Sequence, residues 1–237
     1  MQYSQVFSIT KYTNLKNMIM KTVFALAALV ITQWASAQQE RILKDFSALA
    51  VGGGIELTLV PSSESRLEIQ SGDPKKLKVA NDEGGLSLST EGREKFKLTV
   101  YYSGSVKEIA LSGGVSLTSK GIMKSDNLEI GISGGVEVKI TIDTDRFATA
   151  IASGSDMKVT GTTKTMEVAV ASGGSFEGEN LKSTDSDIIV SSGGSARIFA
   201  TGNVTANVAS GGSLVIYGKP KNVHETKAEG AEIKIVK

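Results

Sequence analysis

Few residues of this chain could do chemistry. Its 237 residues include one histidine and no cysteine. Without thiols, disulfide bonds and thiolate metal sites are excluded. His224 follows the last of a series of glycine-rich motifs, and no Cys/His/Asp pattern surrounds it. We therefore predict no catalytic histidine, no metal site and no cofactor.

Two pairs of carboxylates are the strongest candidates for catalysis. Asp143 with Asp145, and Asp185 with Asp187, each form an Asp-x-Asp sequence, which on a strand would share one face. Glycoside hydrolysis uses two such acids close together. Both pairs lie between more regular, repeated segments, where turn-forming and solvated charges are common. We predict that they are loop charges and that the protein is not an enzyme. A polysaccharide lyase or hydrolase is the alternative.

A Ser-Gly-Gly motif, with Ser-Gly-Ser in one copy, occurs six times between residues 112 and 212. The intervals between its serines are 21, 20, 19, 20 and 18 residues. A nucleophile is not normally copied into every repeat, so we interpret the motif as a structural turn. Its serines are Ser112, Ser133, Ser153, Ser172, Ser192 and Ser210.

Apolar residues alternate on both sides of each motif, which indicates strands. A repeat of about 20 residues is too short for a βαβ unit, which needs about 30. It is long enough for one coil of a β-helix, in which equivalent strands of neighbouring coils pair in parallel. Glycine suits the corner because it adopts positive φ without penalty. The sequence therefore predicts an all-β fold, a parallel β-helix or solenoid with coils of about 20 residues.

The apolar pattern shifts after the second motif. Apolar residues such as Leu111 stand at odd offsets from the first two serines, whereas later ones such as Ile151 stand at even offsets. Since side chains alternate between the faces of a strand, even offsets place the serine on the core side. We predict that four serines point inward and stack, and that Leu111 and Ile132 fill the same slot in the first two coils. Alternatively, the corner itself reverses the alternation. The four are Ser153, Ser172, Ser192 and Ser210.

The first 37 residues read as a secretory signal peptide. Lys21 precedes an apolar run at residues 23–31, and Ala35-Ser36-Ala37 follows as a cleavage signal. We expect cleavage between Ala37 and Gln38, with translation starting at Met18 or Met20. No second apolar segment suggests a membrane span in the mature chain.

Residues 38–237 read as a single solenoid domain with atypical ends. We expect irregular opening coils at residues 38–108, where antiparallel pairing is compatible with the pattern, and regular repeats at residues 109–217. Residues 218–237 would form a C-terminal cap, because solenoid ends must cover an exposed core.

The composition excludes some partners and suggests others. The formal net charge of +1 gives no electrostatic footprint for nucleic acid or an anionic membrane. Aromatic residues, the usual platforms for sugars, make up only 5% of the chain. Tyr101 and Tyr102 are the candidate binding patch, with strand packing as the alternative. Phe147, Phe199 and Tyr217 also stand outside the predicted core register.

The chain resembles the family of putative auto-transporter adhesins with a head GIN domain, which is common in Bacteroidetes-type bacteria. The similar segments are residues 46–59 (FSALAVGGGIELTL), the serial Ser-Gly-Gly turns and Tyr217-Gly218-Lys219-Pro220, and the likeness extends from about Arg41 onward. The resemblance implies an extracytoplasmic β-helical protein in an adhesin-like role.

Three hypotheses for the function follow. The first is an exported, non-enzymatic interaction protein that binds a surface, a glycan or a protein in the periplasm, at the cell surface or outside the cell; an oligomer is compatible with it. The second is a carbohydrate-active enzyme or glycan-binding module. The third is a structural component of the cell envelope.

Overall fold

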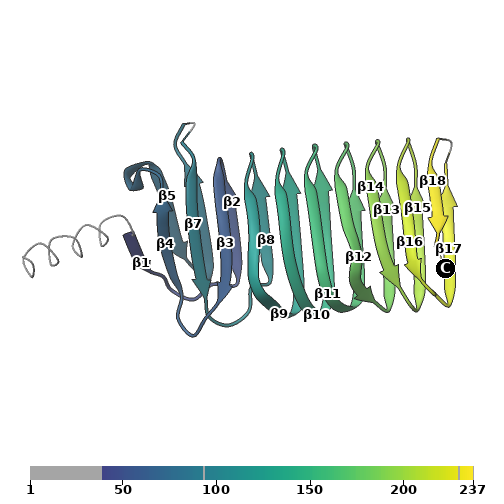
Figure 1. Ribbon diagram of the computed structural model, residues 1–237, viewed down its shortest axis with the longest axis horizontal. Coiled ribbons are helices and arrows are strands. Elements are labelled where there is room, and N and C mark those ends of the chain that lie inside the picture. Colours follow the sequence, from purple (N-terminus) through teal and green to yellow (C-terminus); the bar gives the residue numbers. More distant parts are fainter. Residues whose placement is uncertain (1–38, 93, 229, 237) are drawn as a thin grey trace, which may run out of the picture. The chain divides into compact units, whose positions relative to one another are not determined.

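The computed structural model describes residues 39–92, 94–228 and 230–236, which wind into a β-solenoid (Figure 1). The predicted signal peptide lies outside these residues. Equivalent positions of successive coils pair in parallel, as Ser116, Glu137, Asp156, Ser175, Ser195, Ser213 and Glu232 do, at intervals of 18 to 21 residues. This confirms the predicted fold class and coil length.

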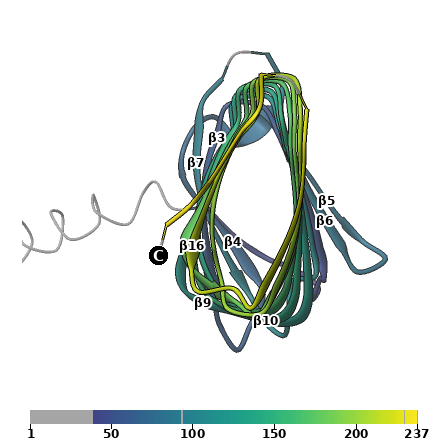
Figure 2. The ribbon, with the colours of Figure 1, turned by 90° about the vertical axis from the view of Figure 1, so that its right-hand side faces the viewer.

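Each coil contributes to two facing walls that are joined at a tight corner and a broad one, as the end-on view shows (Figure 2). The strands β9 (Ser116–Ser133), β10 (Glu137–Ala152) and β11 (Asp156–Val170) run through the broad corner, so each lines both walls. In β9, for example, Leu117 pairs with Leu57 of one wall and Ile130 with Ile109 of the other.

The first wall contains the carboxyl-terminal halves of β9, β10 and β11, together with β2 (Ala48–Gly52), β6 (Gly85–Thr90), β8 (Glu108–Ser112), β13 (Asp185–Val190), β15 (Asn203–Val208) and β17 (Asn222–Lys227). The second wall contains the amino-terminal halves of the same three strands, together with β3 (Ile55–Pro61), β7 (Phe96–Tyr102), β12 (Ser175–Ser183), β14 (Ser195–Ala200), β16 (Ser213–Gly218) and β18 (Glu232–Ile235).

The amino-terminal coils do not stack in chain order. The coil formed by β2 and β3 lies between the coil of β6 and β7 and the coil of β8 and β9. At the outer end, β4 (Arg66–Ser71) pairs antiparallel with β7, β5 (Leu77–Asp82) with β6, and β1 (Gln39–Ile42) with β4. A short 3-10 helix, η1 (Pro74–Lys76), leads into β5. Antiparallel strands therefore cover the last parallel coil.

At the other end, the regular coils continue beyond Tyr217. Strands β17 and β18 pair in parallel with β15 and β16 and complete a further coil, so this end is more regular than the sequence suggested. Glu225 and Lys227 stand at register positions where the preceding coil buries Ala206 and Val208. Charges at such positions oppose further edge-to-edge pairing, so this coil ends the stack through its side chains.

The core is one continuous column of aliphatic side chains between the walls. Its largest fully buried side chains are Phe147 and Phe176, whose ring centroids lie 6.3 Å apart. The assignment of Phe147 to a position outside the core register was wrong, because the side chain is fully buried. The chain turns at the broad corner just before Phe147. The alternation of inward and outward side chains, counted from the glycine-rich motif, is interrupted there and cannot predict which way Phe147 points.

The prediction that four motif serines point into the core is wrong. Ser153, Ser172, Ser192 and Ser210 are exposed and have φ of 51° to 54°. In the first two coils both glycines, such as Gly113 and Gly114, hold the two positive-φ positions of the corner. In the later coils the motif has slipped by one residue, so the serine takes the first of those positions. The alternative, that the corner reverses the alternation, does not hold either, because Ile151 before the corner and Ser155 and Met157 after it are all buried at even offsets from Ser153. The slip of the motif accounts for the change of offsets.

The slip also explains why a small residue, glycine or serine, follows the corner in the later coils. Gly174, Gly194 and Gly212 are buried there, and a Cβ at Gly174 would lie 2.8 Å from Cγ2 of Ile151. Ser155 fills the same place in its coil, and its Oγ accepts a hydrogen bond from the backbone N–H of Val136 at 3.2 Å. In these later coils only a very small side chain fits at this position, which Val115 and Val136 fill in the first two coils.

The motif serines align through their backbone. Each of the six serine carbonyl oxygens accepts a hydrogen bond from a glycine N–H of the neighbouring coil, at 3.0 to 3.3 Å. The side chains do not form one column, because Ser112 pairs with Ser133 in the strands, whereas the next residue along that column is Ala152.

Candidate functional site

The first predicted pair of carboxylates lies in a strand and not in a loop. Asp143 and Asp145 belong to β10 at the broad corner, and both are exposed. Asp143 accepts a hydrogen bond from Oγ1 of Thr162 at 2.9 Å, and Asp145 forms an ion pair with Lys164 at 2.7 Å. That carboxylate raises the pKa of Lys164. Both acids contact the neighbouring coil, which is a structural role.

The second pair is divided between two roles. One carboxylate oxygen of Asp185 accepts hydrogen bonds from the backbone N and from Nδ2 of Asn203, at 2.8 and 2.9 Å. Asp187 is exposed on the first wall, and so is His224 further along it. Within residues 39–92, 94–228 and 230–236, no three His, Cys, Asp or Glu side chains gather as metal ligands would.

The two tyrosines of the predicted patch point to opposite sides of β7. Tyr102 is 3% exposed, and its burial raises the pKa of the phenol to about 12. Tyr101 lies on the outer side, where the guanidinium of Arg66 stacks 3.6 Å above its ring. Consecutive residues of a strand face opposite ways, so the two side chains cannot form one patch. The alternative, strand packing, describes both residues.

The structure instead brings together a surface that the motifs did not reveal, on the outer side of the first wall. Two rows of small side chains cross its strands there; we call them the small-residue face. The row nearer the middle of the wall consists of Ser87, Ala50, Ala110, Gly131, Ala150 and Ala169. The row nearer the tight corner consists of Ser89, Gly52, Ser112, Ser133, Ala152, Ala171 and Ser191.

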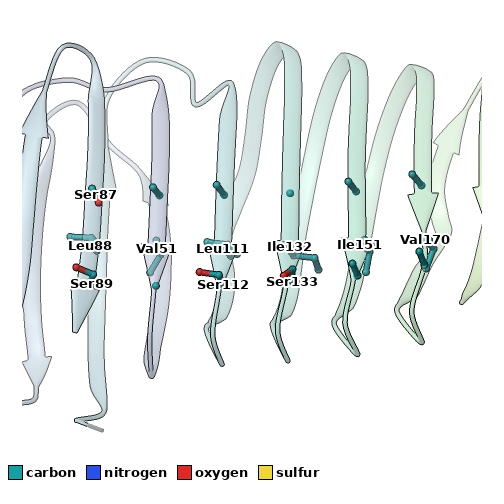
Figure 3. A pocket seen from close by; sticks show the side chains of 18 of the residues that line it. Val51, Ser87, Leu88, Ser89, Leu111, Ser112, Ile132, Ser133, Ile151 and Val170 are labelled. Carbon is teal, nitrogen blue, oxygen red and sulfur yellow. The ribbon is translucent and has the colours of Figure 1, made fainter. Parts of the chain in front are cut away.

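The small-residue face forms the floor of a shallow groove of about 740 Å³, seen in Figure 3. Two further hollows, of about 440 and 250 Å³, adjoin it and share Ala110 with it. Ile189, which pairs with Ala169, is 51% exposed and stands at the end of the middle row. The groove therefore runs along the solenoid axis from β6 to β13, and the smallest hollow extends it to β5.

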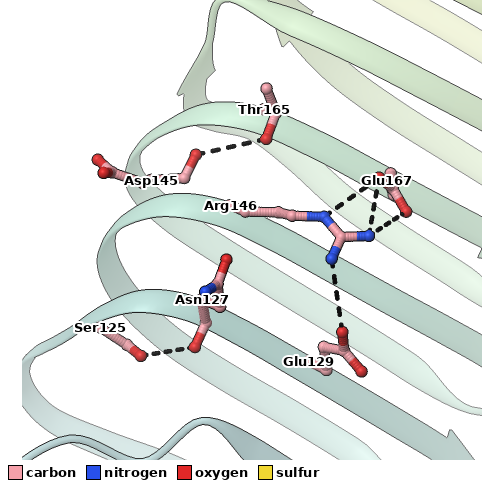
Figure 4. Close-up of polar contacts among 7 residues, drawn as sticks. All are labelled: Ser125, Asn127, Glu129, Asp145, Arg146, Thr165 and Glu167. Carbon is pink, nitrogen blue, oxygen red and sulfur yellow. Dashed lines mark hydrogen bonds and ion pairs between the residues drawn. The ribbon is translucent and has the colours of Figure 1, made fainter.

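Acidic residues border one side of the groove. Glu108, Glu129, Glu167 and Asp187 occupy one row across β8, β9, β11 and β13, with Ala148 between the second and third; we call this row the acidic border. Nη1 of Arg146 lies 3.6 Å from Glu129, and its Nη2 lies 2.8 Å from Glu167 (Figure 4). These contacts raise the pKa of Arg146, chiefly through Glu167. The border has four carboxylates and one bridging guanidinium, so its charge is negative.

The outer side of the second wall has a different chemistry. Its strands carry cross-strand and same-face ion pairs, which include Lys97–Glu56, Lys158–Glu177 and Arg197–Glu177. Mixed charges of this kind are the usual solvated surface of a soluble protein. Both walls are built from the same coils, yet the two rows of the first wall contain no charged side chain. The absence of charge therefore reflects the residues chosen for that face and is not a consequence of the fold.

A repeated signal in the sequence could have revealed the small-residue face. Each of its coils except the last, where Ile189 stands, has a small–apolar–small triplet just before the tight corner, as in Ala110-Leu111-Ser112, Gly131-Ile132-Ser133 and Ala150-Ile151-Ala152. The middle residue faces the core, and the outer two lie on the surface. Taken alone, only the apolar member of each triplet carries a signal, because it marks the core face of the strand.

Several solved structures have a similar fold, including the following three. A protein from Bacteroides fragilis described as a putative adhesin has 21% sequence identity and a TM-score of 0.74, covering 84% of this chain and 96% of that one. A putative adhesin from Parabacteroides merdae has 17% identity and a TM-score of 0.64, covering 85% and 96%. A putative lipid binding protein from Parabacteroides distasonis has 19% identity and a TM-score of 0.64, with the same coverage.

No curated protein sequence matches the chain. Among the residues that the structure describes, there is no helix with the length and apolar character to cross a membrane. One family model matches residues 45–220, which is most of the solenoid. The chain therefore belongs to the family described as "Putative auto-transporter adhesin, head GIN domain".

Proposed function

We propose that this protein is an exported, non-enzymatic adhesion protein that binds its partner through the small-residue face. The observation that carries the proposal is the contrast between the walls of one solenoid: one is covered by ion pairs, and the other presents an uncharged groove. Contiguous exposed surfaces of low polarity mark interaction sites in soluble proteins.

Export and the absence of catalysis are part of the same proposal. The family description supports a protein that acts outside the cytoplasm, and we propose that residues 1–37 direct export and are removed after Ala37. A non-enzymatic role is supported by the contacts of the candidate acids, since Asp143, Asp145 and Asp185 bind neighbouring residues of the strands.

Lipid binding is the second candidate, because one solved relative in the fold is described as a putative lipid binding protein. The uncharged floor of the groove would suit an acyl chain. The acidic border would repel a carboxylate or phosphate head group, so the adhesion proposal is favoured over a fatty acid or an anionic lipid.

The test is an array of glycans, proteins and lipid vesicles probed with the exported form of the protein. The variant Ala150→Arg places a long cation in the middle of the face, and Ser195→Arg places one on the second wall, where Ser195 is exposed. We expect Ala150→Arg to lower binding of the captured partner at least 10-fold and Ser195→Arg to leave it unchanged. Equal binding by both variants would refute the proposed face, and cleavage of an arrayed glycan would refute the non-enzymatic role.

A further inference from the structure

We propose that the groove on the first wall binds a linear, β-1,4-linked glycan that carries free amino groups, with the chain lying along the solenoid axis. The inference rests on the proposed function and names the class of partner for the same face. Four properties of the groove support it: its narrow width, its direction across the strands, its charge and its repeat distance.

The width of the groove argues against a second copy of the chain as the occupant. Seven strands at a spacing of about 4.8 Å give a length of about 30 Å, and two rows of side chains give a width of about 10 Å. That footprint of about 300 Å² is well below the roughly 800 Å² that each partner buries in a stable complex. A face-to-face dimer would also bury the acidic border against the serines and glycines of the partner's tight corner, where no cation stands in the described motifs.

The direction of the groove argues against an extended peptide. A peptide gains affinity from a sheet by adding a strand at its edge, but the groove crosses the outer surface of the strands, where backbone groups already pair within the wall. Side chains on one face of a peptide strand recur every two residues, at about 6.8 Å, which does not match the spacing of about 4.8 Å between the positions of the groove.

The repeat distance favours a polymer of sugars. An extended β-1,4-linked hexose chain advances per sugar by slightly more than the distance between neighbouring strands, 4.7–4.9 Å, so sugars and strands stay nearly in step over the few coils of the groove. Its ring faces are flat and carry C–H groups, which suit a floor of alanine and glycine such as Ala110, Gly131 and Ala150. The serines of the corner row, such as Ser112 and Ser133, offer exposed hydroxyl groups to the sugar hydroxyls along one side.

The charge of the groove selects the amino form of such a glycan. Successive sugars of a β-1,4-linked chain are turned over, so amino groups reach the same side at every second sugar. Glu108 and Asp187 form no ion pair in the described structure and stand four strand spacings apart, an even number. Glu129 and Glu167, two spacings apart, share Arg146 between them. The acidic border thus presents carboxylates at separations that the ammonium groups can match.

The experiment measures binding of a glucosamine hexamer by titration calorimetry, with the N-acetylglucosamine hexamer and a lysine hexapeptide as comparisons. We expect saturable binding of the glucosamine hexamer that weakens as salt rises, because exposed charges are screened. The double variant Glu108→Gln/Asp187→Asn removes the two exposed ion pairs that these carboxylates would form with ammonium groups of the hexamer. It should weaken binding by about 2- to 30-fold. Glu137→Gln/Glu232→Gln, on the second wall, should not change it.

Three results would overturn the inference: no saturable binding of the glucosamine hexamer, equal affinity for its acetylated form, or equally tight binding of the lysine hexapeptide with the same loss in the double variant. The array separates this failure from that of the proposed function. If another partner binds and Ala150→Arg abolishes that binding, the small-residue face is supported as the binding site and the amino-glycan is refuted as its ligand. If Ala150→Arg changes the binding of no arrayed partner, both the proposed face and the proposed ligand are refuted.

Discussion

Replacing one motif serine by glycine should have opposite effects in different coils. Ser172 has a φ of 51°, in the left-handed region, whereas Ser112 ends the extended strand β8. Both side chains are exposed, so neither substitution removes core packing. The two variants Ser172→Gly and Ser112→Gly therefore compare backbone conformation at two copies of the same motif.

The expected magnitudes follow from that conformation. A left-handed backbone costs a residue with a Cβ about 1–2 kcal/mol, and glycine costs about 0.5–1 kcal/mol through the entropy of the unfolded chain. Ser172→Gly should therefore raise the free energy of unfolding by about 0.5–1 kcal/mol. Ser112→Gly relieves no strain and should lower it by about 0.5–1 kcal/mol.

Thermal melts followed by circular dichroism, and urea titrations, would measure both changes. In a chain of this length 1 kcal/mol shifts the melting temperature by about 2–4 °C, so the two variants should lie on opposite sides of the parent protein. Ser192→Gly serves as a second copy of the Ser172 test, since Ser192 has the same φ of 51°. If Ser112→Gly and Ser172→Gly shift the midpoint in the same direction, the slip of the motif at the corner is not the cause of the altered register.

The other predictions concern the core and the ends of the solenoid. Gly174→Val should destabilise the protein by about 1–3 kcal/mol in the same melts, because its Cβ would press on the neighbouring coil. Phe147→Ala should cost about 3–5 kcal/mol, measured by urea unfolding, through loss of a fully buried ring. Tyr102→Phe removes a buried hydroxyl without a partner and should be neutral or stabilising. Since folding raises the pKa of Tyr102 to about 12, the parent protein should lose stability between about pH 10 and 12, where only the unfolded state ionises, and Tyr102→Phe should lose less. Glu225→Val with Lys227→Val should make the last coil adhesive and produce oligomers in light scattering.

The coil length and the parallel pairing could be predicted from the sequence because they depend on local regularity. Glycines at corners and alternating apolar residues recur in each coil, and the pairing follows from the repeat. The insertion of the coil of β2 and β3 between two later coils could not be predicted in this way. It depends on which edges meet in space, and the alternation within a strand carries no information about that.

The candidate site was harder to predict than the fold. The candidates in the sequence were titratable and aromatic residues, and the structure places them in ion pairs, in the core or far from one another, as with Asp145, Phe147 and His224. The small-residue face is made of alanine, glycine and serine, which carry no chemical signature one at a time. Only the register, which aligns Ala110, Gly131 and Ala150 across the strands, makes them a surface.

A solenoid turns one position of its repeat into a line on its surface, and that property links the fold to the proposed function. A residue chosen once per coil appears at every strand spacing, so a choice of small residues gives a groove and a choice of acids gives a charged border. Both lines have the repeat distance of the backbone, about 4.8 Å. A partner that repeats at the same distance can add one equivalent contact per coil, and contacts that are individually weak then add along the groove. A partner without that repeat gains only the contacts of one or two coils. The fold therefore favours a linear, periodic ligand over a compact one, whatever the chemistry of its individual units.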